Sequence, residues 1–82
     1  MVGGRVIELR DDVVCGQNVR RVWCMDRNGD ECAIYVARPD ADRVAIGDQV
    51  WWQGRNAYWT APGGKEDVPL SRIGFSFDTR KQ

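Results

Sequence analysis

Aromatic residues are the side chains of this sequence whose types and spacing could do chemistry, and that chemistry is stacking. Three of the four tryptophans lie in the stretch 46–59, which reads IGDQVWWQGRNAYW. Gly54 and the pair Arg55-Asn56 near its middle predict a tight chain reversal. We therefore expect a β-hairpin with aromatic side chains on both faces, of which only one can be the core.

The position of the turn predicts which aromatic rings are buried. With Arg55-Asn56 as the loop, Trp52 lies opposite Trp59, and Val50 shares their inward face. Trp51 and Tyr58 then point outward, where large exposed rings usually mark a binding surface. The alternative is that Trp51 packs beneath the loop Pro62-Gly63-Gly64 as ordinary core, because a chain of 82 residues has little apolar interior.

The first functional hypothesis is a binding module for single-stranded nucleic acid. Bases stack on aromatic side chains in small β-barrels, with a gain of about 1–3 kcal/mol per base. The expected stacking platform is Trp51, Tyr58 and Tyr35. The expected phosphate contacts are Arg20, Arg21, Arg38 and Arg55.

The second hypothesis is a protein-interaction module. The chain carries 12 basic and 12 acidic residues, so its net charge is zero, whereas binding to polyanions usually needs a basic excess. Exposed Trp and Tyr beside Arg also have the composition of a protein interface. This hypothesis includes a homo-oligomer and an adaptor domain, for which a phage or mobile-element origin would be suitable. The sequence leaves nucleic acid and protein open as partners.

No combination of residues predicts catalysis, a metal site or a cofactor. The chain has no histidine, the commonest general base. Its Asp residues lie mostly at expected turns, where the side chain caps local backbone. Asp40-Ala41-Asp42 lacks the Gly and distal Glu of a calcium loop. Gly63-Gly64-Lys65 lacks the remaining glycine and the Ser or Thr of a phosphate-binding loop. We therefore expect a protein that is not an enzyme.

The cysteines and the hydropathy predict a cytoplasmic protein. Cys15, Cys24 and Cys32 are an odd number, so they cannot form a fully paired disulfide framework, and we expect buried thiols. The N-terminus leads directly into a strand pattern rather than a signal peptide. The apolar runs are too short to cross a bilayer, so no membrane association is expected.

The remaining elements are predicted to be strands joined by tight turns. A first strand from Arg5 is expected to reverse at 16–18, and Asn28-Gly29 predicts a type I′ hairpin turn between strands 19–26 and 31–37. That turn places Trp23 opposite Ile34 and Met25 opposite Cys32, on the face expected to be core. The stretch 39–48 predicts one helical turn with Val44 and Ile46 packed inward. The alternation in 70–78 predicts a final strand, with Phe75 and Phe77 facing inward.

The segment Val44-Ala45-Ile46-Gly47-Asp48-Gln49-Val50 resembles the entry to a late strand in OB-fold proteins, in which a Gly-Asp-x-Val phrase leads into a strand that ends at Gly. SH3-like small barrels use the same phrase. The resemblance implies a small closed sheet. Together with the strand pattern, it predicts one all-β domain over residues 1–82, a five- or six-stranded barrel of OB-like or SH3-like topology with at most one helical turn.

Overall fold

The computed structural model describes the backbone of residues 2–77 and the side chains of residues 2–73. Its elements are β1 (Val2–Val14), β2 (Gln17–Met25), β3 (Glu31–Ala37), the 3-10 turn η1 (Asp40–Arg43), β4 (Gln49–Gln53), β5 (Asn56–Thr60), β6 (Val68–Leu70) and β7 (Arg72–Phe77). The all-β prediction is therefore confirmed. The final strand predicted over 70–78 corresponds to β7, but Asp78 and the side chains of Phe75 and Phe77 lie outside the described residues.

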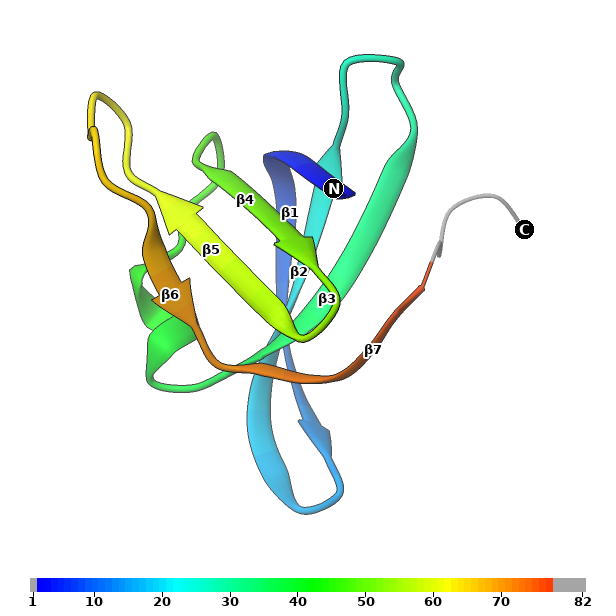
Figure 1. Cartoon of the computed structure of the whole chain (residues 1–82). Coiled ribbons are helices and arrows are strands. Elements are labelled where there is room, and N and C mark those ends of the chain that lie inside the picture. Colours follow the sequence, from blue (N-terminus) through cyan, green and yellow to red (C-terminus); the bar gives the residue numbers. More distant parts are fainter. Residues whose placement is uncertain (1, 78–82) are drawn as a thin grey trace.

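The strands form a single antiparallel sheet in the order β6-β5-β4-β1-β2-β3-β7 (Figure 1). The predicted barrel and the predicted five or six strands are not confirmed, because seven strands form one sheet that is not closed. The two edge strands, β6 and β7, are separated only by Ser71. One continuous segment thus pairs first with β5 and then with β3.

Ser71 is the point at which this segment changes partners, and both of its backbone groups are bonded. Its N–H donates to Asp40 Oδ2 at 2.8 Å. Its carbonyl oxygen accepts from the N–H of Ala37 at 2.7 Å. The turn η1 and the end of β3 therefore fix the point at which the segment 68–77 stops pairing with β5 and begins to pair with β3.

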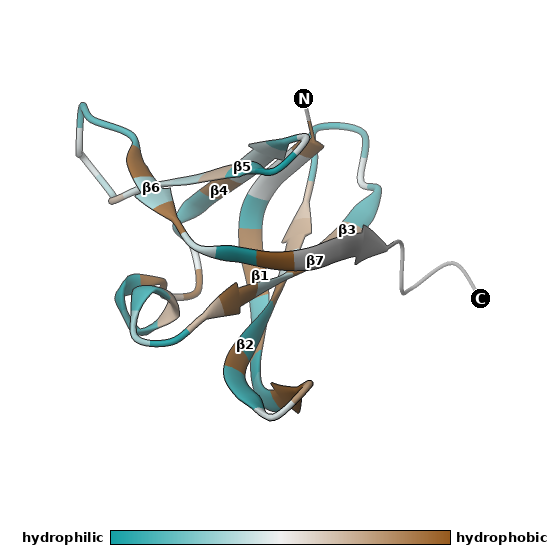
Figure 2. Cartoon of the chain, turned by 60° about the horizontal axis from the view of Figure 1, so that its bottom comes forward, coloured by the Kyte–Doolittle hydropathy of each residue, from teal (hydrophilic) through white to brown (hydrophobic). Residues whose placement is uncertain are grey.

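The core lies between the inward faces of the strands and is closed on one side by η1. Hydrophobic and hydrophilic stretches both occur along β1 and β2 (Figure 2), and the fully buried positions are Val6 in β1 and Val19, Val22 and Cys24 in β2. The buried cluster comprises Val6, Val22, Cys24, Ile34, Val36, Ala41, Val44, Val50, Trp52, Ala57 and Leu70, with Leu9, Cys32 and Trp59 packed against it. Burial of these side chains is the main source of stability in a sheet of this size.

The hairpin β2–β3 has a register one residue away from the predicted one. Trp23 pairs with Ala33, and Met25 pairs with Glu31. The reason is the turn: Gly29 alone has a positive φ (83°), so the type I′ turn, which needs a positive φ at both central residues, does not form. Asp26 Oδ1 instead accepts the N–H groups of Asn28 and Asp30, at 2.8 and 2.9 Å. The resulting loop comprises the three residues 27–29 and is therefore one residue longer than the predicted two-residue turn.

Successive side chains of a strand point to opposite faces of the sheet. The one-residue shift in register therefore places side chains of β2 on the face opposite to the predicted one. Met25, predicted to be core, is exposed. Trp23 leaves the main core and is buried on the opposite face, beneath the guanidinium groups of Arg10 and Arg21, which lie 5.7 and 5.0 Å from its ring centroid. The predicted core face is therefore wrong for β2, while in β3 Cys32 and Ile34 face the core as predicted.

The aromatic hairpin β4–β5 turns at Gly54-Arg55 rather than at Arg55-Asn56, because Gly54 has the positive φ (58°) that a two-residue turn needs at its first position. The register differs from the predicted one by two residues, so Trp52 pairs with Ala57 and Trp51 with Tyr58. A shift of two residues preserves the faces. The inward placement of Trp52 and Trp59 is thus confirmed.

Two further turns differ from expectation. The first hairpin reverses at Cys15-Gly16, both at positive φ (51° and 76°), rather than at 16–18. Cys15 is exposed there, whereas all three thiols were expected to be buried; Cys24 is buried and Cys32 is half-buried. Ile46, predicted to pack inward, is exposed, while Val44 is buried as expected.

Candidate functional site

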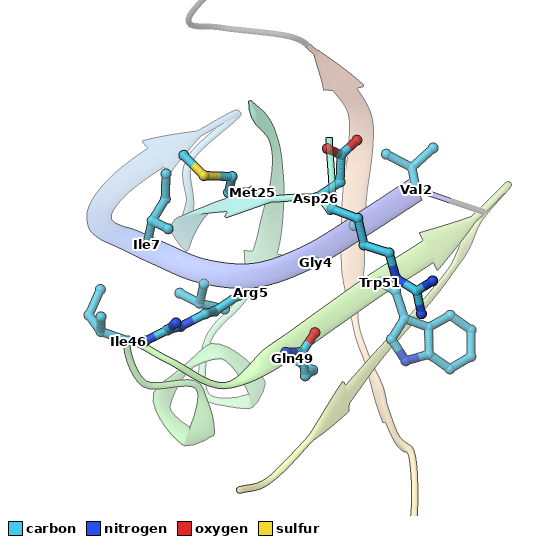
Figure 3. A pocket seen from close by; sticks show the side chains of 12 residues that line it. Val2, Gly4, Arg5, Ile7, Met25, Asp26, Ile46, Gln49 and Trp51 are labelled. Carbon is cyan, nitrogen blue, oxygen red and sulfur yellow. The ribbon is translucent and has the colours of Figure 1, made fainter. Parts of the chain in front are cut away.

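An open groove of about 1060 Å³ runs along the N-terminal part of β1 (Figure 3). Its sides come from β4, from the end of β2 with the loop that follows, and from the loop that precedes β4. Its apolar lining consists of Val2, Val6, Ile7, Met25, Ile46 and Trp51. In Figure 3, Val2 and Trp51 lie toward one end of the groove, and Ile7 and Ile46 lie toward the other.

Two glycines bring the sides of the groove together. A Cβ at Gly3 would overlap the carbonyl oxygen of Val50, and one at Gly4 would overlap that of Met25. Only glycine allows β4 and the end of β2 to approach β1 so closely from its two sides. Arg5, the next residue, pairs with Met25 of β2 and with Gln49 of β4.

Ile46 is turned outward by the loop that carries it. Asp48 is only 4% exposed, and its Oδ2 accepts the N–H of Ala45 at 3.0 Å and the indole Nε1–H of Trp59 at 2.8 Å. Gly47 has φ 96°. This tight turn fixes Asp48 inside and leaves the side chain of Ile46, two residues earlier, on the wall of the groove.

Exposed apolar surface is concentrated in this groove. Among the residues whose side chains the structure describes, the large exposed hydrophobic ones are Val13 (61%), Ile46 (58%), Val2 (48%) and Met25 (37%). All but Val13 line the groove. Scattered exposed hydrophobics are normal on a protein surface, whereas a cluster of them in a concave site is a feature of binding surfaces.

The charged side chains of the groove are Arg5, Arg27 and Asp26. Within residues 2–77, neither arginine has a carboxylate at ion-pair distance. Asp26 uses its Oδ1 to hold the loop after β2. The groove therefore combines an apolar lining with two guanidinium groups whose donors are open to a ligand.

Trp51 and Tyr58 form a stacked pair on the outward face of β4–β5. Their ring centroids are 4.5 Å apart, and their planes differ by 28°. Both rings are half-buried, so Trp51 is neither sealed in the core nor fully exposed. The pair lies on the face that the sequence predicted, and Trp51 extends it to the groove.

Tyr35 and Arg20, predicted to join this platform, lie elsewhere. Tyr35 is buried beside Arg21, whose guanidinium donates to its hydroxyl at 3.0 Å. Arg20 donates to Asp11 at 2.8 Å and to the carbonyl oxygen of Ala41 at 3.4 Å. The structure thus brings together Trp51 and Tyr58 but places Tyr35 and Arg20 in separate clusters.

The other predicted phosphate contacts are also dispersed. Arg21 donates to Asp12 at 2.9 Å, and Arg38 donates to Asp42 at 2.7 Å. Arg55 lies exposed in the turn between β4 and β5. Sequence reasoning missed Ile46, Met25, Arg5 and Arg27, which come from three separate segments. The Gly3-Gly4 pair, directly before the strand expected from Arg5 and inside β1 in the structure, was the signal for a close backbone approach at this place.

Neither a metal-binding cluster nor a long apolar helix occurs among the described residues. No group of three or more His, Cys, Asp or Glu side chains in residues 2–77 is arranged to hold a metal ion. In the same part of the chain, no helix combines the length and the apolar character needed to cross a membrane.

Comparison of the chain with protein-family models, with curated protein sequences and with solved structures found no match.

Proposed function

We propose that this protein is a non-enzymatic binding module that takes a segment of a partner protein into the groove along β1. The observation that carries the proposal is the concentration of Ile46, Val2 and Met25 in one open groove beside Trp51. Burial of exposed apolar side chains is the main driving force of protein association. A net charge of zero fits a protein partner better than a polyanion.

A selection of short random displayed peptides on the immobilised protein tests this function. We expect enriched peptides to bind the parent and to lose binding on Ile46→Asp, which places a charge on the groove wall. Val13→Asp is the matched control, because Val13 is equally exposed but lies outside the groove. Peptides that bind both variants like the parent would refute the groove as the binding surface.

Single-stranded nucleic acid is a second candidate, favoured by the stacked pair Trp51 and Tyr58. One ring of such a pair can continue its stack with a base. Titration with an oligonucleotide, followed by tryptophan fluorescence, separates the two candidates. Quenching that weakens at high salt and disappears on Trp51→Ala favours nucleic acid. An unchanged signal at low salt removes this candidate.

The partner protein can also be a second copy of the chain. Sedimentation over a range of concentrations tests this form of the proposal. A dimer that dissociates on dilution and is lost on Ile46→Asp would identify the groove as a self-association surface. A monomer throughout leaves a different protein as the partner.

A further inference from the structure

We infer that the partner segment in the groove is acidic, with carboxylates close to an apolar anchor residue. This inference deepens the proposed function and rests on it. It is drawn from the two arginines of the groove, which have no carboxylate partner within the described residues, and from the apolar lining beside them.

Carboxylates hold four of the nine arginines whose side chains the structure describes, and of the other five only Arg5 and Arg27 line the groove. The closest nitrogen–oxygen contacts are Arg10–Glu8 at 3.4 Å, Arg20–Asp11 at 2.8 Å, Arg21–Asp12 at 2.9 Å and Arg38–Asp42 at 2.7 Å. A guanidinium presents several N–H donors in a planar fork that matches a carboxylate. These pairs neutralise the positive charge along the β1–β2 hairpin and η1.

Arg5 and Arg27 have no such partner within the described part of the chain, and both line the groove. The carboxylate nearest in sequence, Asp26, accepts the N–H groups of Asn28 and Asp30 instead. The groove therefore offers two unneutralised guanidinium groups. A ligand that brings carboxylates would complete here the pairing that the protein provides internally elsewhere.

The apolar lining determines what must accompany those carboxylates. Ile46 and Trp51 line the groove from two different segments, and Met25 adds a flexible thioether that adapts to the shape of a ligand. A branched or aromatic side chain would bury these surfaces, as anchor residues do in peptide grooves. A nucleic acid would instead need a longer series of cations, and the groove supplies two.

The test uses the same displayed peptides and then synthetic copies of the enriched ones. We expect the enriched peptides to combine Asp or Glu with a Leu, Ile or Phe, and their dissociation constants are measured by tryptophan fluorescence. Arg5→Glu and Arg27→Glu should each weaken binding by about tenfold or more, as the loss of a charge-assisted hydrogen bond predicts. Lys65→Glu, which makes the same charge change in an exposed loop outside the groove, should leave binding unchanged.

A charge exchange completes the test. A copy of an enriched peptide with Lys in place of its acidic residues should bind Arg27→Glu more tightly than it binds the parent. Far-UV circular dichroism and thermal melts establish that each variant is folded. If Arg5→Glu unfolds the protein, Arg5→Gln removes the charge and serves in its place.

The outcomes separate this inference from the proposed function. Neutral apolar peptides that bind equally to the parent and to Arg27→Glu, but are lost on Ile46→Asp, would overturn the acidic ligand and keep the protein-binding groove. A selection in which no peptide depends on Ile46 would overturn both. In a further outcome, an oligonucleotide displaces an enriched peptide from the parent but not from Arg27→Glu. That result would show that the arginines bind phosphates, and it would also overturn the inference.

Discussion

At the scale of single residues, Asp48 shows how a surface position is determined from the inside. Its buried carboxylate bonds the indole of Trp59 and the backbone of Ala45, and this turn leaves Ile46 exposed. The resemblance to small-barrel proteins pointed to Gly47-Asp48 as a strand entry. It did not reveal that the carboxylate would be buried, because the indole that bonds it lies eleven residues further along the chain.

The hydrogen bond between Trp59 and Asp48 should be measurable as stability. Trp59→Phe removes the indole N–H and leaves a buried carboxylate with one donor fewer. We expect a loss of about 2 kcal/mol in the free energy of unfolding, as for hydrogen bonds to charged groups, measured by urea denaturation. Tyr58→Phe keeps its ring on the outward face and should change stability by less than about 0.5 kcal/mol. Equal effects of the two substitutions would contradict the role of Asp48.

The three thiols should react at very different rates. Burial, with a smaller contribution from Cys32, raises the pKa of Cys24 to about 12. Thiolate is the reactive form, so Cys24 should stay unreactive in the folded protein at neutral pH, while exposed Cys15 reacts first. A disulfide reagent followed by absorbance should show a fast phase that Cys15→Ser removes. A fast phase that survives this substitution would show that another thiol is exposed.

At the scale of elements, the close approach of β1 to its neighbours depends on glycine. Gly3→Ala forces a Cβ against the backbone of β4, and neither backbone can move without breaking the ladder. We expect a larger loss of stability than for Gly29→Ala, where no atom lies near and only the positive φ costs about 1–2 kcal/mol. Thermal melts of the two variants make the comparison. A milder effect at Gly3 would mean that β1 and β4 can separate freely.

The elements also show how far the sequence could predict this fold. The strands, the η1 turn and the inward face of the aromatic hairpin followed from alternation and turn residues. The register of β2–β3 did not, because Asn28-Gly29 is compatible with two turn types. Asp26 selects between them through its side chain. A choice made by one carboxylate cannot be derived from the dipeptide alone.

The groove was less predictable than the strands. Trp51 and Tyr58 were predicted as a pair because they lie on one face of a single hairpin. Arg5, Met25, Arg27 and Ile46 are brought together by the crossing of three segments, and no local period connects them. Tyr35 and Arg20 were misplaced for the same reason, since their contacts depend on the register of β2–β3 and on the ion pairs of η1.

At the scale of the whole molecule, stability should fall at both ends of the pH range. The hydrogen bond from Arg20 lowers the pKa of Asp11, and bonds from Ser71 lower the pKa of Asp40, both from 3.8. Their contributions are complete above that value and are lost as the pH falls through the lower folded pKa values. The raised pKa of Cys24 has the opposite sign: its contribution is complete below 9.0 and is lost as the pH rises toward about 12.

Urea denaturation at a series of pH values tests this dependence. The variant Asp11→Asn/Asp40→Asn should lose stability less steeply in acid than the parent, because two of the groups that take up protons are gone. Cys24→Ala should flatten the alkaline side, whatever its cost at neutral pH. Identical acid slopes in the parent and the double variant would show that these carboxylates do not govern acid unfolding.

The segment around Ser71 also has a consequence for biosynthesis. β5 and β3 are both completed by the same ten residues, Val68–Phe77, which the ribosome makes after β1–β5. A nascent chain that ends before Ser71 therefore leaves β3 without its outer neighbour, and one that ends before Val68 leaves both sides of the sheet open. Emergence of this segment from the exit tunnel is the event that allows the native sheet to be completed.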